Sequence, residues 1–488
     1  MTETLTEIKR KSVVGAVSYF ARTAVLQIIG LGSVFTLGFL LSPEDFGIYG
    51  FVTQIIGILI FFSDIGLAAA LIQKKTPPTD EELAVVFTVQ QILSWLIVSV
   101  AVLLIASGLI EAKTGLTGVW VMLSLALSFP LATLKTISSV KLERKLEFNK
   151  LVIPQIIEQI VFHGILIYLA WNKFGALAYA YAVIFRSMAG VVTLYILAPW
   201  KPRLSFRFGI VKSLVSYGAI FQINDFLARI KDQLFYAVLG WFLPLQQFGY
   251  INWAKGWSMY PYNLTVQNVM AVTFPTFSRL QNEPKLLRKA IETALFFISL
   301  AIFPILAGMS VFVFPFVHLV EGYQKWEPAL WSLVFFSLSI GWGAISTPLT
   351  NTLNATGHIS KTLKLMSIWT TLTWILTPLC YWWFGFTGVS IAAFLISCTS
   401  ILSIWYTQEV IEFTVWPHIW RQLLASVVLA VVGIVGIPVW EQSFLTLALG
   451  ILLSGLAFLG MMWVLGRREV EAHIRVLLKA SKSPAQTS

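Results

Sequence analysis

Apolar residues form long uninterrupted stretches along this chain. No Asp, Glu, Lys or Arg occurs within residues 83–110, 365–408 or 442–466. A helix of about 20 apolar residues crosses a hydrocarbon layer roughly 30 Å thick. The helices of a soluble protein carry their apolar residues on one face, whereas these stretches are apolar on all sides. The pattern therefore predicts membrane-spanning helices.

The same pattern, followed along the whole chain, predicts an all-α polytopic membrane protein with about fourteen transmembrane helices. The connections between them are short, which leaves no room for a soluble domain. The predicted spans are 13–41, 46–73, 84–110, 117–140, 152–171, 178–198, 213–243, 246–273, 290–320, 328–355, 362–384, 387–408, 417–440 and 444–466.

Composition and the placement of charge support this interpretation. Hydrophobic residues make up 57% of the 488 positions and charged residues 12%, against about 25% charged residues in soluble domains. The net charge of +11 raises the question of a nucleic-acid partner. With the N-terminus inside, however, 25 basic residues fall in cytoplasmic segments, and only Lys113, Lys173 and Lys325 fall in external loops. This positive-inside bias places both termini in the cytoplasm, and we expect no nucleic-acid partner.

Cofactor and metal signals are missing from the sequence. Cys380 and Cys398 lie inside apolar stretches and provide neither a disulfide framework nor a metal-ligand spacing. No GxxxxGK[ST] phosphate loop occurs, which argues against direct ATP driving. We expect no metal and no cofactor.

Two short motifs recur along the chain. Residues 37–47 resemble residues 239–249 at an offset of 202, and the Phe-Gly pair at 174–175 recurs at 384–385 at an offset of 210. The similar offsets predict two pseudo-symmetric six-helix halves, an architecture typical of alternating-access transporters. The predicted organisation is an N-terminal half at 1–198, a C-terminal half at 199–408, two extra transmembrane helices at 409–466 and a basic cytoplasmic tail at 467–488.

The turn before the second span is well specified locally. Ser42 is an N-cap residue, Pro43 suits the first helical position, and Glu44 and Asp45 are acids at the positive helix end. The matching turn of the second half, which starts at Pro244, lacks the acids that would cap its helix.

Several of these segments resemble the Wzx-type polysaccharide transporters, a family of the multidrug/oligosaccharidyl-lipid/polysaccharide exporter superfamily. The matching segments lie in the first two thirds of the chain, in the expected order. They are 41–49 (LSPEDFGIY), 63–67 (SDIGL), 143–148 (ERKLEF), 248–250 (FGY), 274–281 (FPTFSRLQ) and 325–326 (KW).

The resemblance implies a flippase of the cell inner membrane. Its substrate would be undecaprenyl-diphosphate-linked oligosaccharide, moved from the cytoplasmic to the outer leaflet for the synthesis of O-antigen, capsule or exopolysaccharide. The lipid tail of the substrate would stay in membrane lipid, and the two C-terminal spans would form a groove for it. A polysaccharide polymerase is the implied protein partner.

Ionisable residues inside the predicted spans are the candidate substrate contacts. Each costs roughly 2.5–3.5 kcal/mol at a helix centre, so such residues usually face a wet cavity or a partner. Cations outnumber anions by six to four, and this surplus suits a diphosphate. The ten residues are Arg22, Lys135, Arg186, Arg229, Lys231, Lys255, Asp64, Glu158, Asp225 and Asp232.

One helical stripe of span 213–243 carries Gln222, Asp225, Arg229 and Asp232. We predict that Arg229 binds substrate and that the other three line the cavity. The alternative is that Asp225 and Arg229, four residues apart, pair with each other. The stripe requires a wet or protein-lined surface under either interpretation.

The first span carries Arg22 on a polar face with Ser18 and Tyr19. We predict a phosphate contact for Arg22 and a cavity-lining position for the other two. The alternative is an arginine that snorkels to the inner interface. It is less favoured, because roughly nine residues at 1.5 Å rise separate Arg22 from the start of the span.

Span 246–273 carries Lys255 and Tyr262 on one face. We predict that Lys255 binds substrate and that Tyr262 lines the cavity. Trp253, Trp257 and Tyr260 form a different stripe, which we interpret as packing.

Arg186 and Asp64 each have two interpretations of similar weight. Arg186 is a fourth candidate substrate cation, or the partner of a buried carboxylate on another helix. Asp64 is an ion-coupling carboxylate, or a local helix break beside Ser63 and Gly66. The histidines are scattered, and no role is predicted for them.

Three other functions of membrane proteins make different demands on the sequence. A glycosyltransferase or polymerase usually needs a sizeable loop or domain around the reacting bond, so we expect no enzymatic activity. A drug/cation antiporter favours an acidic surplus in its cavity, opposite to the surplus predicted here. A lipid II flippase stays open, because cavity charge does not distinguish it.

Overall fold

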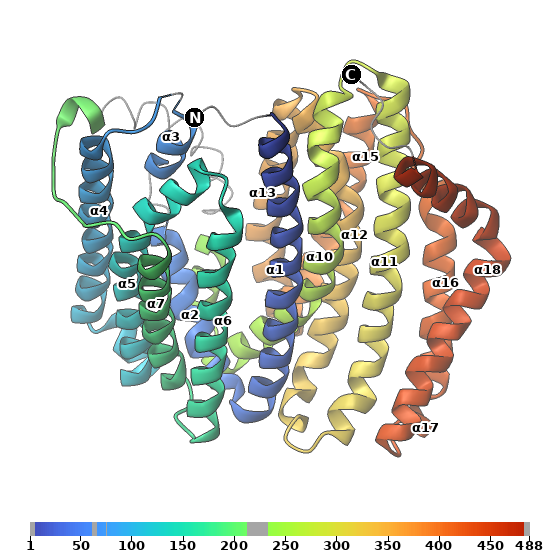
Figure 1. The fold of residues 1–488 in the computed structure, drawn as a ribbon. Helices are drawn as coiled ribbons and strands as arrows, with labels where there is room; N and C mark the ends of the chain where they lie inside the picture. Colours follow the sequence, from blue (N-terminus) through green and yellow to red (C-terminus); the bar gives the residue numbers. More distant parts are fainter. Residues whose placement is uncertain (1–4, 61–65, 75, 212–232, 483–488) are drawn as a thin grey trace. The chain divides into compact units, whose positions relative to one another are not determined.

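The computed structural model describes the backbone of residues 5–60, 66–74, 76–211 and 233–482 (Figure 1). It describes the side chains of these ranges except 5–21, 24, 272 and 468–482. Within these ranges the regular elements are helices, with no strand. They are α1 (Leu5–Leu40), α2 (Pro43–Ile60), α3 (Leu67–Gln73), α4 (Asp80–Ala106), α5 (Leu109–Arg144), α6 (Phe148–Trp171), α7 (Leu177–Leu197), α9 (Phe235–Phe242), α10 (Leu245–Arg279), α11 (Pro284–Leu319), η2 (Gln324–Ala329), α12 (Leu330–Ala355), α13 (Ile359–Phe384), α14 (Thr387–Cys398), α15 (Ile401–Gln408), α16 (Trp416–Val435), α17 (Ile437–Trp440) and α18 (Phe444–Lys482).

Nine helical segments within the described ranges are long and apolar enough to cross a membrane. Large apolar side chains such as Leu103, Ile196 and Val464 are mostly exposed on them. This exposure is what a lipid environment permits and water does not. The prediction of an all-helical, multi-pass membrane protein is confirmed, whereas the number fourteen stays a prediction.

The chain forms two compact units, Met1–Asn252 and Trp253–Ser488, and the division falls inside α10. In the first unit, α1 packs on α6 and α6 on α7, around buried residues such as Leu37, Leu166 and Tyr179. In the second, α11 and α12 pack around residues such as Ile291 and Leu349. The predicted pseudo-symmetric halves with a boundary at 198 stay a prediction.

The predicted cap of α2 is confirmed. Ser42 N donates to Asp45 Oδ2 at 2.9 Å, and Asp45 N donates back to Ser42 Oγ at 3.1 Å. The other carboxylate oxygen of Asp45 accepts the Ala176 N–H at 2.6 Å, just before α7 begins. One side chain therefore starts α2 and ties it to α7.

In the first unit, the N-terminal turns of α2 and α10 meet without side chains between them. A Cβ atom at Gly47 would lie 1.9 Å from Leu245 O, and one at Gly249 would lie 1.7 Å from Pro43 O. Both glycines are therefore required for this approach. The two contacts are related by the 202-residue offset of the repeat, so each motif contacts its counterpart as in a two-fold pair.

The C-terminal segment continues as helix beyond the predicted last span. The last span was predicted to end at 466, whereas α18 continues to Lys482 (Figure 1, dark red). The membrane-spanning part of α18 packs on α16.

Candidate functional site

Many of the predicted site residues lie outside what the structure describes. Among the described candidates, Arg22 on α1 and Lys255 on α10 are partly buried. The gathering of these cations around one cavity stays a prediction. The candidates outside the described residues are Asp64, Gln222, Asp225, Arg229, Lys231 and Asp232, together with the side chains of Ser18 and Tyr19.

A charged network joins three neighbouring helices of the first unit, α5, α6 and α7 (Figure 1). Glu158 on α6 binds Lys135 on α5 through Oε1. Its other oxygen, Oε2, lies 3.9 Å from Nε of Arg186 on α7. The side chains of Glu158, Lys135 and Arg186 are 12%, 20% and 39% exposed. The ion pair foreseen as the alternative for Arg186 is therefore present.

Local sequence explains how this carboxylate fits between α6 and α7. A Cβ atom at residue 190 of α7 would lie 1.8 Å from Glu158 Oε1, so the absence of a side chain at Gly190 leaves the space that the carboxylate occupies. Phe162 lies one turn after Glu158 on α6, and the guanidinium of Arg186 lies 5.4 Å from its ring centroid. This is a cation–π contact, which holds Arg186 beside Glu158.

The network has more positive than negative charge. Within the part of the chain that the structure describes, two cations share one carboxylate, which leaves a surplus of +1. The closest approach of Arg186 to Glu158, at 3.9 Å, is longer than a hydrogen bond. A guanidinium has five N–H donors in a planar fork. Arg186 therefore retains N–H groups that can donate hydrogen bonds to an anionic ligand. Their planar arrangement is suited to bidentate contact with phosphate.

His163 belongs to the same region, and no role was predicted for it. Its Nδ1 lies 2.6 Å from Oγ of Ser33 on α1, and its ring packs edge-on against Phe162 at 5.0 Å. Lys135 and Glu158 were predicted only as ionisable residues inside the spans. No local signal identified Glu158 as the common partner of Lys135 and Arg186, because the three residues lie on three different helices.

In the second unit, Tyr262 and the tryptophan stripe of α10 make packing contacts. Tyr262 Oη lies 2.9 Å from Thr347 Oγ1 and joins α10 to α12. Trp253 stacks on Trp326 at 4.9 Å, and both rings are buried. The interpretation of the tryptophan stripe as packing is confirmed for Trp253.

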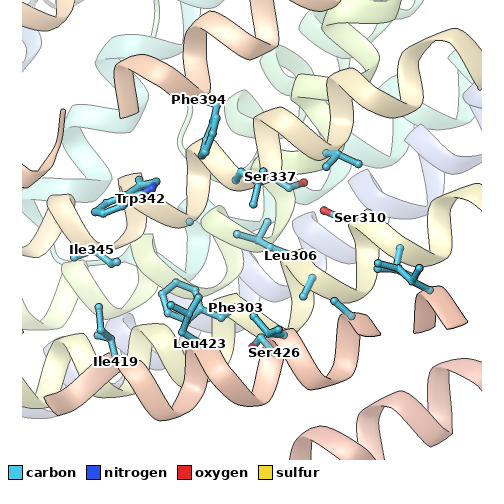
Figure 2. Close-up of a pocket in the computed structure, with 18 of the residues that line it drawn as sticks. Phe303, Leu306, Ser310, Ser337, Trp342, Ile345, Phe394, Ile419, Leu423 and Ser426 are labelled. Atoms are coloured by element: carbon cyan, nitrogen blue, oxygen red, sulfur yellow. The ribbon is translucent and has the colours of Figure 1, made fainter. Parts of the chain in front are cut away.

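An apolar cavity of about 810 Å³ also lies in the second unit (Figure 2). Its walls are mainly α11, α12 and α16, with further residues from α14, α15 and α17. Among the described residues that line it, the hydroxyl-bearing side chains are serines and no side chain is charged. The residues labelled in Figure 2 are Phe303, Leu306, Ser310, Ser337, Trp342, Ile345, Phe394, Ile419, Leu423 and Ser426.

A carboxylate fixes the segment that leads into α16. Glu292 on α11 accepts hydrogen bonds from the backbone N and the hydroxyl of Thr414, both at 3.1 Å. It also accepts a hydrogen bond from Arg288 Nε at 3.0 Å. The α16 wall of the cavity is thus positioned from α11. No residue of the described part of α18 lines this cavity, and a lipid-tail groove formed by the two C-terminal spans stays a prediction.

Comparison with known proteins shows a family match over most of the chain. Residues 37–330 match the family model described as polysaccharide biosynthesis protein. The teichuronic acid biosynthesis protein TuaB of Bacillus subtilis (strain 168) is 25% identical over 277 residues, which are 55% of each chain. The lipopolysaccharide biosynthesis protein WzxC of Escherichia coli (strain K12) is 24% identical over 324 residues, 66% of this chain and 65% of that one.

A third relative, the succinoglycan biosynthesis transport protein ExoT of Rhizobium meliloti (strain 1021), is 23% identical over 309 residues, 62% of this chain and 60% of that one. The matched regions thus span less than two thirds of each of these relatives.

Two solved structures share the fold. A lipid II flippase, MurJ, in its inward closed conformation, superposes with a TM-score of 0.74 at 16% identity, over 94% of this chain and 100% of that one. An inward-facing multidrug resistance transporter of the MATE family superposes with a TM-score of 0.56 at 14% identity, over 79% and 95%. At these identities the likeness concerns the fold alone.

Proposed function

This chain belongs to the polysaccharide biosynthesis protein family, and on that basis we propose that it is a flippase for polyprenyl-diphosphate-linked oligosaccharide. It moves this substrate from the cytoplasmic to the outer leaflet by alternating access, for the synthesis of surface polysaccharide. The relatives named for lipopolysaccharide biosynthesis and for succinoglycan transport support this proposal.

The observation that carries the proposal is the surplus positive charge among α5, α6 and α7. Ion pairs inside a membrane usually balance, whereas Lys135 and Arg186 share the single carboxylate of Glu158. Arg186 is also the most exposed of the three. A diphosphate supplies the missing negative charge, and a guanidinium binds it with two parallel hydrogen bonds.

The apolar cavity of the second unit suits the lipid part of the substrate. Phe303, Leu306 and Leu423 are typical of its walls, and no charged group lines it. A hydrocarbon chain that enters it from the bilayer leaves no polar group without a hydrogen bond. We assign this cavity to a segment of the polyprenyl tail.

Location and partners follow from the same proposal. The excess of basic residues in alternate connections supports cytoplasmic N- and C-termini in the inner membrane. The chain acts without catalysis, and a polysaccharide polymerase consumes the translocated product.

The sign of the charge surplus argues against a drug/cation antiporter, because a cationic drug would be repelled by the network. A lipid II flippase would use the same diphosphate chemistry. Deletion of the chain distinguishes the two flippases. Loss of an oligosaccharide flippase removes surface polysaccharide, whereas loss of a lipid II flippase stops peptidoglycan synthesis and the cells die.

The test is Arg186→Gln, assayed by surface polysaccharide at matched protein level in the membrane. We expect output to fall about tenfold or more, because a buried contact between charges is lost. Arg207→Gln is the matched control, since Arg207 pairs with Glu81 but is 67% exposed and lies outside the apolar helices. Wild-type output from Arg186→Gln would refute the phosphate contact.

A further inference from the structure

We propose that Glu158 is a resident counter-anion that the diphosphate of the substrate displaces from Arg186. Glu158 occupies the place of the phosphate between transport cycles and lowers the affinity for it, so that the substrate is released. This inference rests on the proposed function and assigns a role to a residue that does not itself bind substrate.

The two contacts of Glu158 are unequal. The carboxylate makes a direct hydrogen bond to Lys135, whereas its closest atom lies 3.9 Å from Arg186. Arg186 is 39% exposed and Lys135 is 20% exposed. Arg186 is therefore the partner that can change ligand, and Lys135 is the partner that holds the carboxylate in place.

The second cation, Lys135, lowers the free-energy cost of exchanging Glu158 for phosphate at Arg186. In a simple ion pair, a ligand that takes the arginine leaves a buried carboxylate alone, which costs several kcal/mol. Here Glu158 keeps its hydrogen bond to Lys135 while Arg186 turns to the phosphate. Conversely, Arg186 is not left as an unpaired charge inside the membrane when no substrate is bound.

The position of the carboxylate depends on a glycine in the facing helix. Any side chain at residue 190 would overlap Glu158 Oε1, since a Cβ atom there would lie 1.8 Å away. Gly190→Ala therefore displaces the carboxylate without removing any charge. The overlapped oxygen is the one that accepts the hydrogen bond from Lys135, so the variant disturbs the contact that holds the carboxylate in place.

A carrier must bind its substrate tightly enough to load it and weakly enough to release it. Removing the counter-anion shifts this balance towards retention. We expect Glu158→Gln to bind diphosphate more tightly and to transport more slowly. A residue with a purely structural role would reduce both.

The experiment measures binding of geranylgeranyl diphosphate, a short polyprenyl diphosphate, to the purified full chain in lipid nanodiscs. Geranylgeraniol, which has the same tail and no phosphate, controls for tail binding. We expect the dissociation constant for the diphosphate to fall about tenfold in Glu158→Gln, with that for the alcohol unchanged.

Lys135→Met is expected to act in the opposite direction. It leaves Glu158 with Arg186 alone, so the exchange now strands the carboxylate and diphosphate binding weakens about tenfold. Glu409→Gln is the matched control, because Glu409 forms a 2.8 Å ion pair with Lys361 in the second unit. It should leave the affinity unchanged.

The outcomes separate the two proposals. If Arg186→Gln weakens diphosphate binding but Glu158→Gln leaves it unchanged or weakens it, the counter-anion role is wrong and the flippase proposal stands. If Arg186→Gln has no effect on diphosphate binding, both the phosphate contact of Arg186 and the counter-anion role of Glu158 are wrong. Should Glu158→Gln not fold, Lys135→Met still decides the question, because unchanged or tighter diphosphate binding by that variant contradicts the counter-anion role.

Discussion

Single polar side chains connect different helices. Asp45 is one case: its carboxylate accepts hydrogen bonds from Ser42 within its own turn and from Ala176, 131 residues later. Glu158 is another, with one oxygen directed to each of two helices. Membrane helices gain little from apolar contact with each other rather than with lipid, so such polar contacts specify which helices meet.

We expect Asp45→Ala to lower the stability of the chain by about 2 kcal/mol, because the buried N–H of Ala176 and the start of α2 both lose their acceptor. The measurement is the midpoint of thermal unfolding in detergent. Glu44→Ala is the control, since Glu44 is exposed in the same helical turn. Equal midpoints for the two variants would show that Asp45 does not join α2 to α7.

Pairs of helices approach closely where the repeat places glycine. The N-terminal turns of α2 and α10 touch through Gly47 and Gly249, each against the backbone of the other segment. A carbonyl oxygen cannot move aside as a flexible side chain can. The contact between α2 and α10 therefore tolerates no Cβ atom at either glycine.

Gly249→Ala should therefore lower the unfolding midpoint, although alanine favours a helix by about 1 kcal/mol over glycine. Its Cβ would lie 1.7 Å from Pro43 O. Gly256→Ala in the same helix is the control, because nothing lies within 4 Å of a Cβ atom there and only the helix preference acts. A midpoint for Gly249→Ala equal to or above that of Gly256→Ala would contradict the close crossing.

At the scale of the whole molecule, the two compact units carry chemically different sites. The first has surplus positive charge among α5, α6 and α7, and the second has an uncharged cavity among α11, α12 and α16. A lipid-linked sugar has the matching parts, a diphosphate and a hydrocarbon tail. Under the proposed function, each unit recognises a different part of one substrate.

Filling the cavity should reduce transport without unfolding the chain. Gly341 on α12 lines it, and a Cβ atom there would meet only Leu306 Cδ1, at 3.9 Å. We expect Gly341→Leu to weaken binding of geranylgeraniol and to lower surface polysaccharide. Gly343→Leu, two residues along and outside the lining, is the control. Unchanged binding of the alcohol by Gly341→Leu would exclude this cavity as the tail site.

The sequence predicted most helix boundaries closely. The predicted spans ending at 171 and 408 correspond to α6, which ends at Trp171, and α15, which ends at Gln408, and the last span begins at Phe444 as predicted. Hydropathy, proline and caps act within a few consecutive residues, so the linear order of residues contains this information. The long stretches without charged residues identified a membrane protein in the same way.

The sequence by itself determined that the chain is an all-helical membrane protein and, to within a few residues, where most of its described helices start and end. Only the tertiary structure decided that Lys135 and Arg186 share Glu158, that Gly190 admits that carboxylate, and that α11, α12 and α16 enclose an apolar cavity. The physical reason is that these contacts join different helices. They depend on how each helix is rotated about its axis and on which neighbour it packs against, and no single stretch of sequence specifies either.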